Sequence, residues 1–282
     1  LLLYQNEKSS SWKRECSGEL PLQLHTEKKQ GSLAIVGLGP GKREYMTARA
    51  LRAVAGAEYV LGHVKYLKPL EPLLAGKNVI SSSMGKEVDR AKQAIELSRS
   101  HAVAIVSGGD AGVYGMASIV LEVLEHSKEV VEVEVIPGIT AANAAASRAG
   151  SPLSGDFAVI SLSDLLTPLE VIEKRLDAFF SAGVPVVLYN PRSRGRPHNF
   201  ALAIGHARKH RPATTPVAIV KNALRDDEET TITTLGEIEA SAEKVDMHTT
   251  VIIGGSESRI WRMGDNVKGI ITPRGYHRKY VY

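Results

Sequence analysis

Short runs of β-branched and other apolar residues alternate with stretches of helical periodicity along most of this 282-residue chain. Each run is too short to be a helix of its own and ends in glycine or in polar loop residues. The expected strands comprise residues 33–36, 58–61, 102–106, 131–135, 157–162, 186–189, 217–220 and 251–253. Because strands that alternate with helices are joined by crossover connections, this pattern predicts an α/β fold with a largely parallel sheet.

Two breaks in the pattern define the expected domains. Residues 1–30 are polar and aperiodic, so we expect a disordered or non-family leader ahead of the folded body. The strand pattern stops at Pro137-Gly138 and then begins again. We predict an N-terminal α/β domain over residues 31–138, a C-terminal α/β domain over residues 139–276 and a tail over residues 277–282.

Capping residues mark two helix starts. Thr47 is expected to cap a helix that runs to Ala57. The string Thr167-Pro168-Leu169-Glu170 combines a capping box with proline at the first helical position, which predicts a second start.

Composition excludes several classes of protein. The single cysteine, Cys16, cannot form an internal disulfide or a Cys-x-x-Cys site, so a reducing cytoplasm is the expected location. No segment approaches the roughly 18 consecutive apolar residues of a membrane helix, so we expect no membrane partner. The net charge of +4 fits an acidic small substrate, a nucleic acid or simply a lysine-rich surface.

The first glycine loop, Gly37-Leu38-Gly39-Pro40-Gly41, follows the first expected strand, where a dinucleotide-binding loop would lie. Lys42 occupies the third glycine position of that fingerprint, and the second expected strand ends in His63 rather than in an acidic residue. Arg43 stands where a P-loop needs serine or threonine. A NAD-linked oxidoreductase is therefore poorly supported, and a tight turn remains an open alternative.

The second glycine loop, residues 107–115, leaves an apolar run that reads as a buried strand. Glycine lets backbone amides approach a ligand, and Asp110 can accept hydrogen bonds from a ribose or from a cation. The alternative is a helix entrance with Asp110 as a local cap. The small residues 138–146 are typical of a helix packed closely on a sheet.

The densest basic cluster of the folded body consists of Arg192, Arg194 and Arg196. Such a loop can grip phosphates or carboxylates, and the alternative is a solvated loop. Few aromatic residues flank it, so we expect no nucleic-acid partner.

His206 and His210 have the spacing of two metal ligands on one helix face. No third ligand is evident, and cations are favoured at a helix C-terminus, so we expect no metal site.

Long strings of the chain, in order, resemble the tetrapyrrole-type, class III S-adenosylmethionine methyltransferases. These strings are Gly37–Gly41, Gly108–Gly115 and Val135–Ala141. Further strings resemble the branch that methylates C17 of precorrin-3B or of cobalt-factor III, namely residues 160–168, 188–193, 231–236, 249–254 and 272–276.

The resemblance implies two α/β domains with S-adenosylmethionine in the cleft between them, and usually a homodimer. The implied cofactor contacts are Gly108, Gly109, Asp110, Val113, Tyr114, Thr140, Ala141, Leu162, Tyr189, Asn190, Asn222, Ala223, Thr249 and Thr250. The implied reaction is C17 methylation with ring contraction, and we favour the cobalt-bearing substrate over the metal-free one.

A tetrapyrrole partner carries acetate and propionate carboxylates, which a basic cleft would fit. The candidate substrate-binding residues are Gly37, Gly39, Pro40, Gly41, Lys42, Arg43, Arg192, Arg194, Arg196 and Arg274. Candidate acid/base groups for the ring contraction are His63 and Asp164.

Three departures from the family pattern stand out. Ala111 replaces the usual proline of the second glycine loop, Gly255 replaces an asparagine, and Lys42-Arg43 stands where an aspartate is common. Two alternatives stay open: a methyltransferase of this class with another tetrapyrrole, RNA or protein as acceptor, and a non-enzymatic binder of anionic ligands or nucleic acid.

Overall fold

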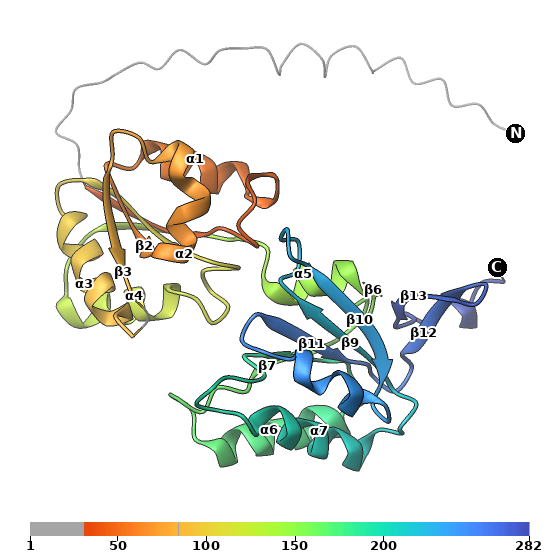
Figure 1. Ribbon diagram of the computed structural model, residues 1–282. Coiled ribbons are helices and arrows are strands. Elements are labelled where there is room, and N and C mark those ends of the chain that lie inside the picture. The colour runs from red at the N-terminus through yellow and green to blue at the C-terminus, as the bar shows by residue number, and fades with distance from the viewer. Residues whose placement is uncertain (1–30, 84, 282) are drawn as a thin grey trace, which may run out of the picture. The chain divides into compact units, whose positions relative to one another are not determined.

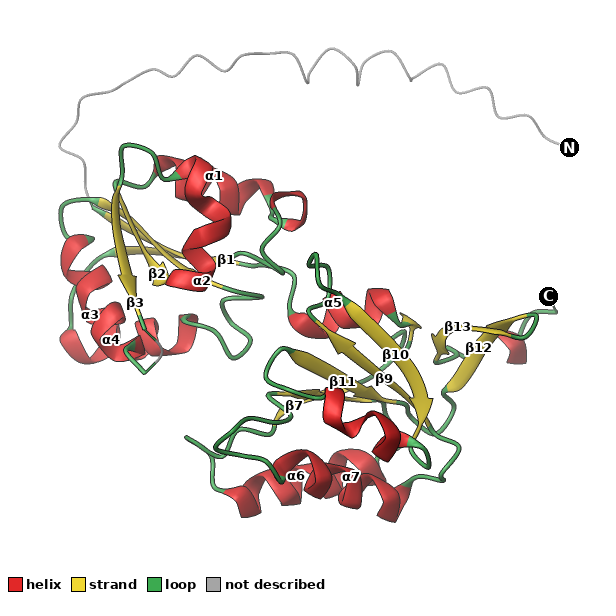
Figure 2. Ribbon diagram, in the orientation of Figure 1, coloured by secondary structure: helices red, strands yellow, loops and turns green. Residues whose placement is uncertain are grey.

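The computed structural model describes residues 31–83 and 85–281 of the chain. The predicted leader over residues 1–30, with Cys16, lies outside the described residues. Within the described residues the strands form two five-stranded sheets and one three-stranded sheet (Figure 1, Figure 2). Contacts group the residues from Gly31 onward into one compact unit, so the domain boundary expected at residue 138 stays a prediction. No helix in the described part of the chain is long and apolar enough to cross a membrane.

The first sheet is parallel throughout, in the order β3-β2-β4-β1-β5, as expected from the alternating pattern. Its strands are β1 (Ser32–Gly37), β2 (Tyr59–His63), β3 (Asn78–Ser82), β4 (Ala102–Ser107) and β5 (Glu132–Ile136). The connections between them contain η2 (Arg43–Tyr45), α1 (Ala48–Gly56), α2 (Val64–Leu67), η3 (Lys68–Leu73), α3 (Glu87–Leu97) and α4 (Ala117–Ser127). The cap expected at Thr47 is confirmed, because its Oγ1 accepts a hydrogen bond from Ala50 N at 3.1 Å.

Helices cover both faces of this sheet, and alternating side chains feed two separate cores. Ile35 and Ile105 lie in the core with α3 and α4. Val36 and Val106 lie in the core with α1 and α2. β1 and β4 are neighbours whose connections leave in opposite directions along the sheet, which is where open α/β sheets bind ligands.

The second sheet, β10-β9-β11-β8-β7, corrects the expectation of a largely parallel sheet. Its strands are β7 (Ala158–Ser161), β8 (Val186–Tyr189), β9 (Pro216–Lys221), β10 (Glu229–Thr234) and β11 (Thr249–Ile253). Only β7 and β8 pair in parallel, whereas β9 pairs antiparallel with β10 and with β11, and β8 pairs antiparallel with β11. The link from β9 to β10 is too short to hold a crossover helix, so those strands form a hairpin.

The second sheet is also covered on both faces. The core beneath one face includes residues of α6 (Leu169–Ser181) and α7 (Asn199–His210), and that of the other face includes residues of α5 (Ala141–Arg148). The third sheet, β12-β13-β6, follows the C-terminal end of α5. Its strands are β6 (Gly150–Ser151), β12 (Arg259–Met263) and β13 (Asn266–Ile271), and the remaining short helices are η4 (Ile238–Lys244) and η5 (Tyr276–Arg278).

The helix start predicted at Thr167 is wrong by one residue. α6 begins at Leu169, and the N-cap position is taken by Pro168, whose ψ of 142° is extended. Within the described residues this start makes no side-chain cap hydrogen bond, so Thr167 does not act as the predicted cap.

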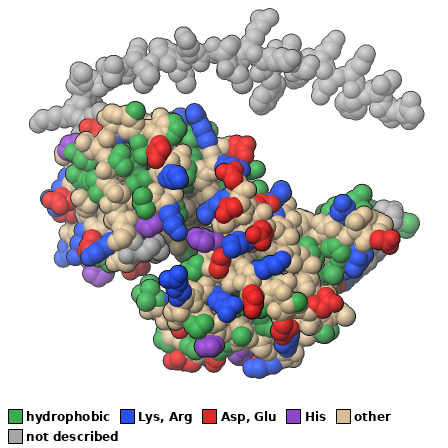
Figure 3. Space-filling model, in the orientation of Figure 1, with side chains coloured by type: hydrophobic (Ala, Val, Ile, Leu, Met, Phe, Trp, Pro, Cys, Tyr) green, Lys and Arg blue, Asp and Glu red, His purple; other side chains and the backbone are tan. Residues whose placement is uncertain are grey.

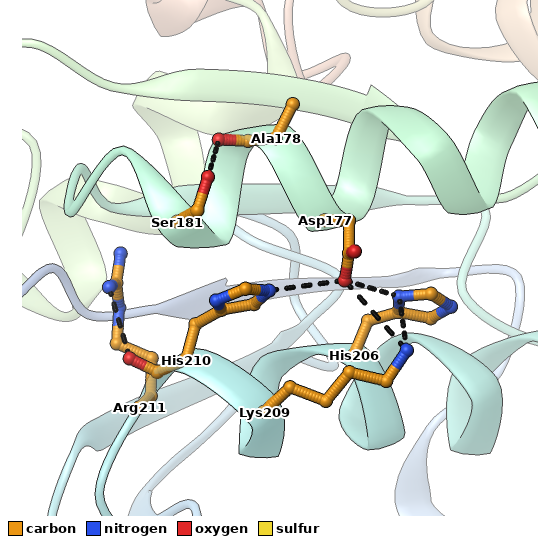
Figure 4. A network of polar contacts seen from close by, with 7 residues as sticks. All are labelled: Asp177, Ala178, Ser181, His206, Lys209, His210 and Arg211. Carbon is orange, nitrogen blue, oxygen red and sulfur yellow. Dashed lines mark hydrogen bonds and ion pairs between the residues drawn. The ribbon is translucent and has the colours of Figure 1, made fainter.

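An ionic contact joins α6 to α7 (Figure 4). Asp177 Oδ1 lies 2.9 Å from His206 Nδ1 and 3.1 Å from His210 Nε2. Lys209 Nζ lies 3.8 Å from the same oxygen. The hydrogen bonds from His206 and His210 lower the pKa of the Asp177 carboxyl, so the histidine pair expected at the helix C-terminus also pairs with a carboxylate of the adjacent helix.

We predict that the Asp177 contact stabilises the fold at neutral pH and is lost in acid. A carboxyl whose pKa is lower in the folded state contributes stability above its unfolded pKa of about 3.9 and loses it as pH falls through the folded value. Asp177→Asn should therefore lower Tm at pH 7, and the difference from wild type should shrink towards pH 3. Thermal unfolding at several pH values measures this, and a difference independent of pH would contradict it.

We also predict that Phe180→Ala will cost about 3–5 kcal/mol of unfolding free energy, because it empties a fully buried site between α6 and the second sheet. Val130→Ala is the control, since Val130 is 98% exposed and its truncation should stay within about 0.5 kcal/mol. Urea unfolding of both variants makes the comparison, and equal midpoints would contradict this description of the core.

Candidate functional site

Three loops converge at the C-terminal edge of the first sheet. Gly39 N donates to Gly109 O at 2.9 Å, and Gly109 N donates to Gly39 O at 2.8 Å. A Cβ on Gly138 would lie 2.3 Å from Gly109 O and 2.7 Å from the Gly37 backbone. Glycine is therefore required here by contact between backbones, and not only by turn geometry.

Asp110 ties these loops together. Its Oδ1 accepts a hydrogen bond from Gly112 N at 2.8 Å, and its Oδ2 accepts one from Gly138 N at 2.9 Å. The first bond is a local contact within the loop, and Asp110 does not cap a helix, because α4 begins at Ala117 with Met116 at its N-cap position. The second bond reaches the loop after β5, so the carboxylate also holds two loops in place.

Tyr114 joins the second glycine loop to the second sheet. It has a positive φ of 52°, and its side chain is largely exposed. Its hydroxyl oxygen accepts a hydrogen bond from Ser161 N at 3.1 Å, and its ring centre lies 5.5 Å from that of Tyr189. Among the expected cofactor contacts of this loop, Val113 and Tyr114 are the exposed ones.

Tyr189, at the end of β8, connects the start of α5 to the second sheet. Its hydroxyl accepts a hydrogen bond from Ala142 N at 2.6 Å and lies 2.5 Å from Thr140 Oγ1. Burial raises the pKa of Tyr189, so the phenol stays protonated at neutral pH. Its carbonyl oxygen accepts a hydrogen bond from Leu162 N at 2.9 Å, which brings the expected contacts Thr140, Ala141 and Leu162 around one tyrosine.

The edge of the second sheet at the ends of β8 and β9 carries strained backbone. Asn190, Asn222 and Leu224 have φ values of 50°, 49° and 62°. Non-glycine residues in this conformation cluster at functional sites, because the surrounding structure must hold them there. Since β11 is antiparallel, its first residue, Thr249, pairs with Lys221 at this same edge. The structure thus brings together three segments that lie far apart in the sequence, which carry Asn190, then Asn222 and Ala223, then Thr249 and Thr250.

The loop between β9 and β10 contacts the first glycine loop. Lys42 Nζ lies 2.7 Å from Asp226 Oδ1, and Arg225 Nε donates to Pro40 O at 2.9 Å. Arg43 is exposed. Lys42 therefore has a carboxylate partner, although Asp226 is itself almost fully exposed and the pair is weak.

The three loop arginines are not equivalent. Arg192 Nη1 donates to Ala242 O at 3.2 Å, and Arg196 Nη1 donates to Ser163 Oγ at 2.8 Å. Arg196 Nε lies 3.9 Å from a carboxylate oxygen of Asp164, the candidate acid/base group. Arg194 is exposed and has no hydrogen-bond or ion-pair partner among the described residues, so it is the arginine of this loop that is available to a ligand.

The structure places Arg274 away from this edge. The nearby Thr272 Oγ1 bonds Pro152 O and Ser258 Oγ, beyond the C-terminal end of α5. The expected cofactor contacts lie at the N-terminal end of α5. Arg274 is thus not brought together with Lys42, Arg43 and Arg194 within one chain.

His63 ends β2 at the same edge as the glycine loops. Its Nδ1 accepts a hydrogen bond from Lys65 N at 3.2 Å. Burial lowers the pKa of His63, and the nearby cations Arg90 and Lys65 lower it further, so the imidazole is neutral at pH 7.

Sequence reasoning missed Arg90, Ser107 and Tyr66, which lie beside these loops. Arg90 carried no motif, since it falls within an ordinary amphipathic helix. Ser107 was grouped with the glycine loop, although strand alternation places its side chain on the same face as Ile105. Tyr66 contacts Gly108, where an added Cβ would lie 2.6 Å from the tyrosine ring.

Charges of both signs are interspersed on the face of the molecule shown in Figure 3. That face does not present the single-sign surface on which non-specific nucleic-acid binding depends. A hollow of about 750 Å³ lies away from the glycine loops, between α3 and α4. It is lined by Ile95, Ile119 and Val123 among others.

Two open sheets that present glycine loops, left-handed residues and buried tyrosine contacts at their edges define a ligand-binding α/β protein. The family model "Tetrapyrrole (Corrin/Porphyrin) Methylases" matches residues 32–239. The chain belongs to this family of methyltransferases.

Three curated relatives are similar over most of this chain. A probable cobalt-factor III C(17)-methyltransferase of Salmonella typhimurium is 45% identical over 86% of this chain and 99% of its own length. A precorrin-3B C(17)-methyltransferase of Sinorhizobium is 40% identical over 87% and 97%. The cobalamin biosynthesis protein CbiHC of Archaeoglobus fulgidus is 44% identical over 89% of this chain, which spans 54% of that longer relative.

Solved structures agree on the fold. The crystal structure of the methyltransferase CobJ matches with a TM-score of 0.80 and 34% identity, covering 86% of this chain and all of that one. A uroporphyrin-III C-methyltransferase of Thermus thermophilus, crystallised with S-adenosylhomocysteine, matches with a TM-score of 0.60. At 24% identity, over 79% of this chain and 92% of that one, this second likeness shows the fold alone.

We predict that Gly138→Ala will disrupt the edge, because the new Cβ meets backbone atoms of Gly109 and Gly37 and no flexible side chain can give way. It should lower Tm by several degrees and abolish measurable binding of S-adenosylhomocysteine. Gly205→Ala is the control. It lies within α7 with no atom within 4 Å of the new Cβ, and should stabilise the helix by about 0.5–1 kcal/mol. Calorimetry distinguishes the two, and full binding by Gly138→Ala would contradict the contact.

Proposed function

We propose that this chain is an S-adenosylmethionine-dependent enzyme that methylates C17 of a cobalamin-pathway tetrapyrrole and contracts its ring. The observation that carries the proposal is the 45% identity that extends over 99% of the Salmonella relative, a probable cobalt-factor III C(17)-methyltransferase. The relatives CobJ and the Sinorhizobium enzyme support the same class of reaction.

The residues at the two sheet edges fit a cofactor with an adenosine and an amino-acid part. An added Cβ on Gly109 would have no atom within 4 Å, so a ligand has room to approach the backbone there. Ser107 Oγ is enclosed and has no hydrogen-bond partner among the described residues. We assign the cofactor to the sheet edge that carries Gly108, Gly109, Asp110, Val113, Tyr114, Thr140, Ala141 and Leu162. The contacts from the second sheet would be Tyr189, Asn190, Asn222, Ala223, Thr249 and Thr250.

When bound, S-adenosylmethionine supplies an electrophilic methyl group. The chain's own contribution to this step is positioning, because loss of the sulfonium charge on transfer to carbon needs no strong base. Asp110 fixes the loop that would carry the cofactor, and Tyr114 and Tyr189 hold that loop against the second sheet.

The macrocycle would lie against the cationic groups that remain available at this edge, Arg194, Arg43 and Lys42. Its carboxylates would compete with Asp226 for Lys42. The ring contraction also needs proton movements, for which His63 and Asp164 are the candidate groups.

The cobalt-bearing substrate is the preferred one, since relatives named for cobalt-factor III include the Salmonella enzyme. We further propose that the cofactor cleft lies between domains of residues 31–138 and 139–276, that the protein acts as a homodimer, and that it works in the cytoplasm.

Anaerobic incubation of the purified chain with S-adenosylmethionine and either cobalt-factor III or precorrin-3B tests the proposal directly. Mass and absorbance should show the gain of one methyl group with cobalt-factor III. Turnover with precorrin-3B alone would reverse the choice of substrate. Cofactor binding without turnover on either would assign the chain to another acceptor.

We predict that Asp110→Asn will weaken S-adenosylhomocysteine binding about 10- to 100-fold, because the charged acceptor of the Gly112 and Gly138 amides is lost. Asp156→Asn is the matched control, since Asp156 is exposed and precedes β7 at its other end. Isothermal titration measures both, and equal dissociation constants would place the cofactor elsewhere.

A further inference from the structure

The last row of side chains at the C-terminal edge of the first sheet is polar, although it faces the apolar core beneath α3 and α4. Val103 and Ile105 point into that core from β4, so by alternation Ser107 points to the same side. Leu61 does the same from β2, which places His63 there. His63 pairs in register with Ser82, and the register of β2 with β4 makes His63 and Ser107 the next neighbours.

Arg90 of α3 lies over this row as a buried cation. It is 5% exposed, and its Nε donates to Ser82 Oγ at 2.7 Å. Nη2 donates to Ser83 O at 3.1 Å, and Nη1 has only the Met116 sulfur at 3.5 Å. No carboxylate within the described part of the chain pairs with it. Buried charges are normally paired, so an anionic partner is missing from this side chain's surroundings.

Ser107 has an unused hydroxyl at the same place. The residue is 5% exposed, and its Oγ is enclosed with no hydrogen-bond partner within the described residues. Buried hydroxyls are bonded in the large majority of cases. An unpartnered donor beside a glycine loop at a ligand-binding edge indicates a partner that arrives with a ligand. Because the hydroxyl is enclosed, a covering side chain has to move aside to admit that ligand.

His63 adds a second donor. Because its Nδ1 accepts the Lys65 amide, the neutral ring carries its proton on Nε2, which has no partner among the described residues. Nε2 is also absent from the enclosed unpartnered atoms, so it keeps contact with solvent. The charged groups that act on this ring are Arg90 and Glu87 of α3 and Lys65 of α2, and the ring of Tyr66 packs against it.

We propose that Ser107 Oγ and His63 Nε2, beside the unpaired charge of Arg90, form a subsite for a carboxylate group. A carboxylate offers two acceptor oxygens to the two donors and supplies the negative charge that Arg90 lacks. Arg90 acts as a positioning residue, because its hydrogen bonds hold the ends of β3 and α3 over the row. Tyr66 contacts Gly108, so the subsite adjoins the second glycine loop.

This inference rests on the proposed function for the identity of the ligand. The carboxylate belongs either to the amino-acid end of the cofactor or to an acetate or propionate of the macrocycle. Both sources share one chemistry, and the experiment distinguishes them.

Ser107→Ala is the sharpest variant, because it should move stability and affinity in opposite directions. Removing an unsatisfied buried hydroxyl should raise the Tm of the ligand-free chain, whereas removing a donor to a charged group should weaken ligand binding by about tenfold or more. Ser98→Ala is the control. Ser98 is also fully buried, but its Oγ donates to Ile95 O at 2.7 Å, so this variant should lower Tm and leave binding unchanged.

Titrations with four probes identify the source of the carboxylate. If it is the cofactor's, Ser107→Ala weakens binding of S-adenosylhomocysteine but not of 5′-methylthioadenosine, which lacks the amino-acid end. If it is the substrate's, the variant weakens binding of cobalt-factor III but not of its methyl ester. Unchanged affinity for both acids, or an equal loss for acid and analogue, would overturn the subsite.

The titration of His63 gives a readout that a purely structural role would not move. A bound carboxylate favours the imidazolium, so the pKa of His63 should rise when the acid probe binds and stay constant with its analogue. The ¹³C-labelled histidine resonances, assigned with His63→Gln, measure this pKa in wild type. Arg90→Met should raise the pKa of His63 in the ligand-free chain, because it removes a nearby positive charge. A His63 pKa that both changes leave unaltered would contradict the subsite. Failure of wild type to bind any of the probes would count against the proposed function instead.

Discussion

Backbone contact between three glycines is the constraint on which the rest of the site depends. Gly37 ends β1, Gly109 follows β4 and Gly138 follows β5, yet their backbones lie within contact distance of one another. That closeness lets Asp110 reach Gly138 N and lets Gly39 and Gly109 exchange hydrogen bonds. A Cβ on Gly37 or Gly138 would lie under 3 Å from backbone atoms of a facing loop, whereas Gly109 favours glycine through its positive φ of 68°. The edge of the first sheet is therefore a rigid platform, and Tyr114 extends from it to Ser161 of the second sheet.

The second sheet supplies the opposite part of the site by a different route. Its strands are mostly antiparallel, so residues from the end of β9 and the start of β11 meet at one edge. The left-handed residues Asn190 and Asn222 lie at that edge and turn the chain sharply after β8 and β9. Strain of this kind persists only where packing enforces it, and the buried Tyr189 contact with Thr140 and Ala142 provides such packing.

Much of this architecture can be predicted from the sequence, because alternation and glycine position are local signals. The strands of the first sheet follow from runs such as residues 102–106, and Thr47 follows from capping chemistry. The direction of the strands in the second sheet cannot be predicted from the sequence in the same way. Only the short link between β9 and β10 indicates an antiparallel pair, and the sequence of β10 is only a weak signal of a strand. The roles of Arg90 and Ser107 could not be predicted either, because each depends on which neighbours a distant strand or helix supplies. Arg194 and Arg196 look alike in sequence, and only packing separates the exposed side chain from the paired one.

The central claim is that the cofactor occupies the edge built from the glycine loops and the strained turns of the second sheet. Hydrogen–deuterium exchange with and without S-adenosylhomocysteine tests it most directly. The account predicts slower exchange over residues 107–115, 138–142, 161–163 and 189–190, with β12 and β13 unchanged. Protection confined to the groove between α3 and α4, or to β12 and β13, would contradict it.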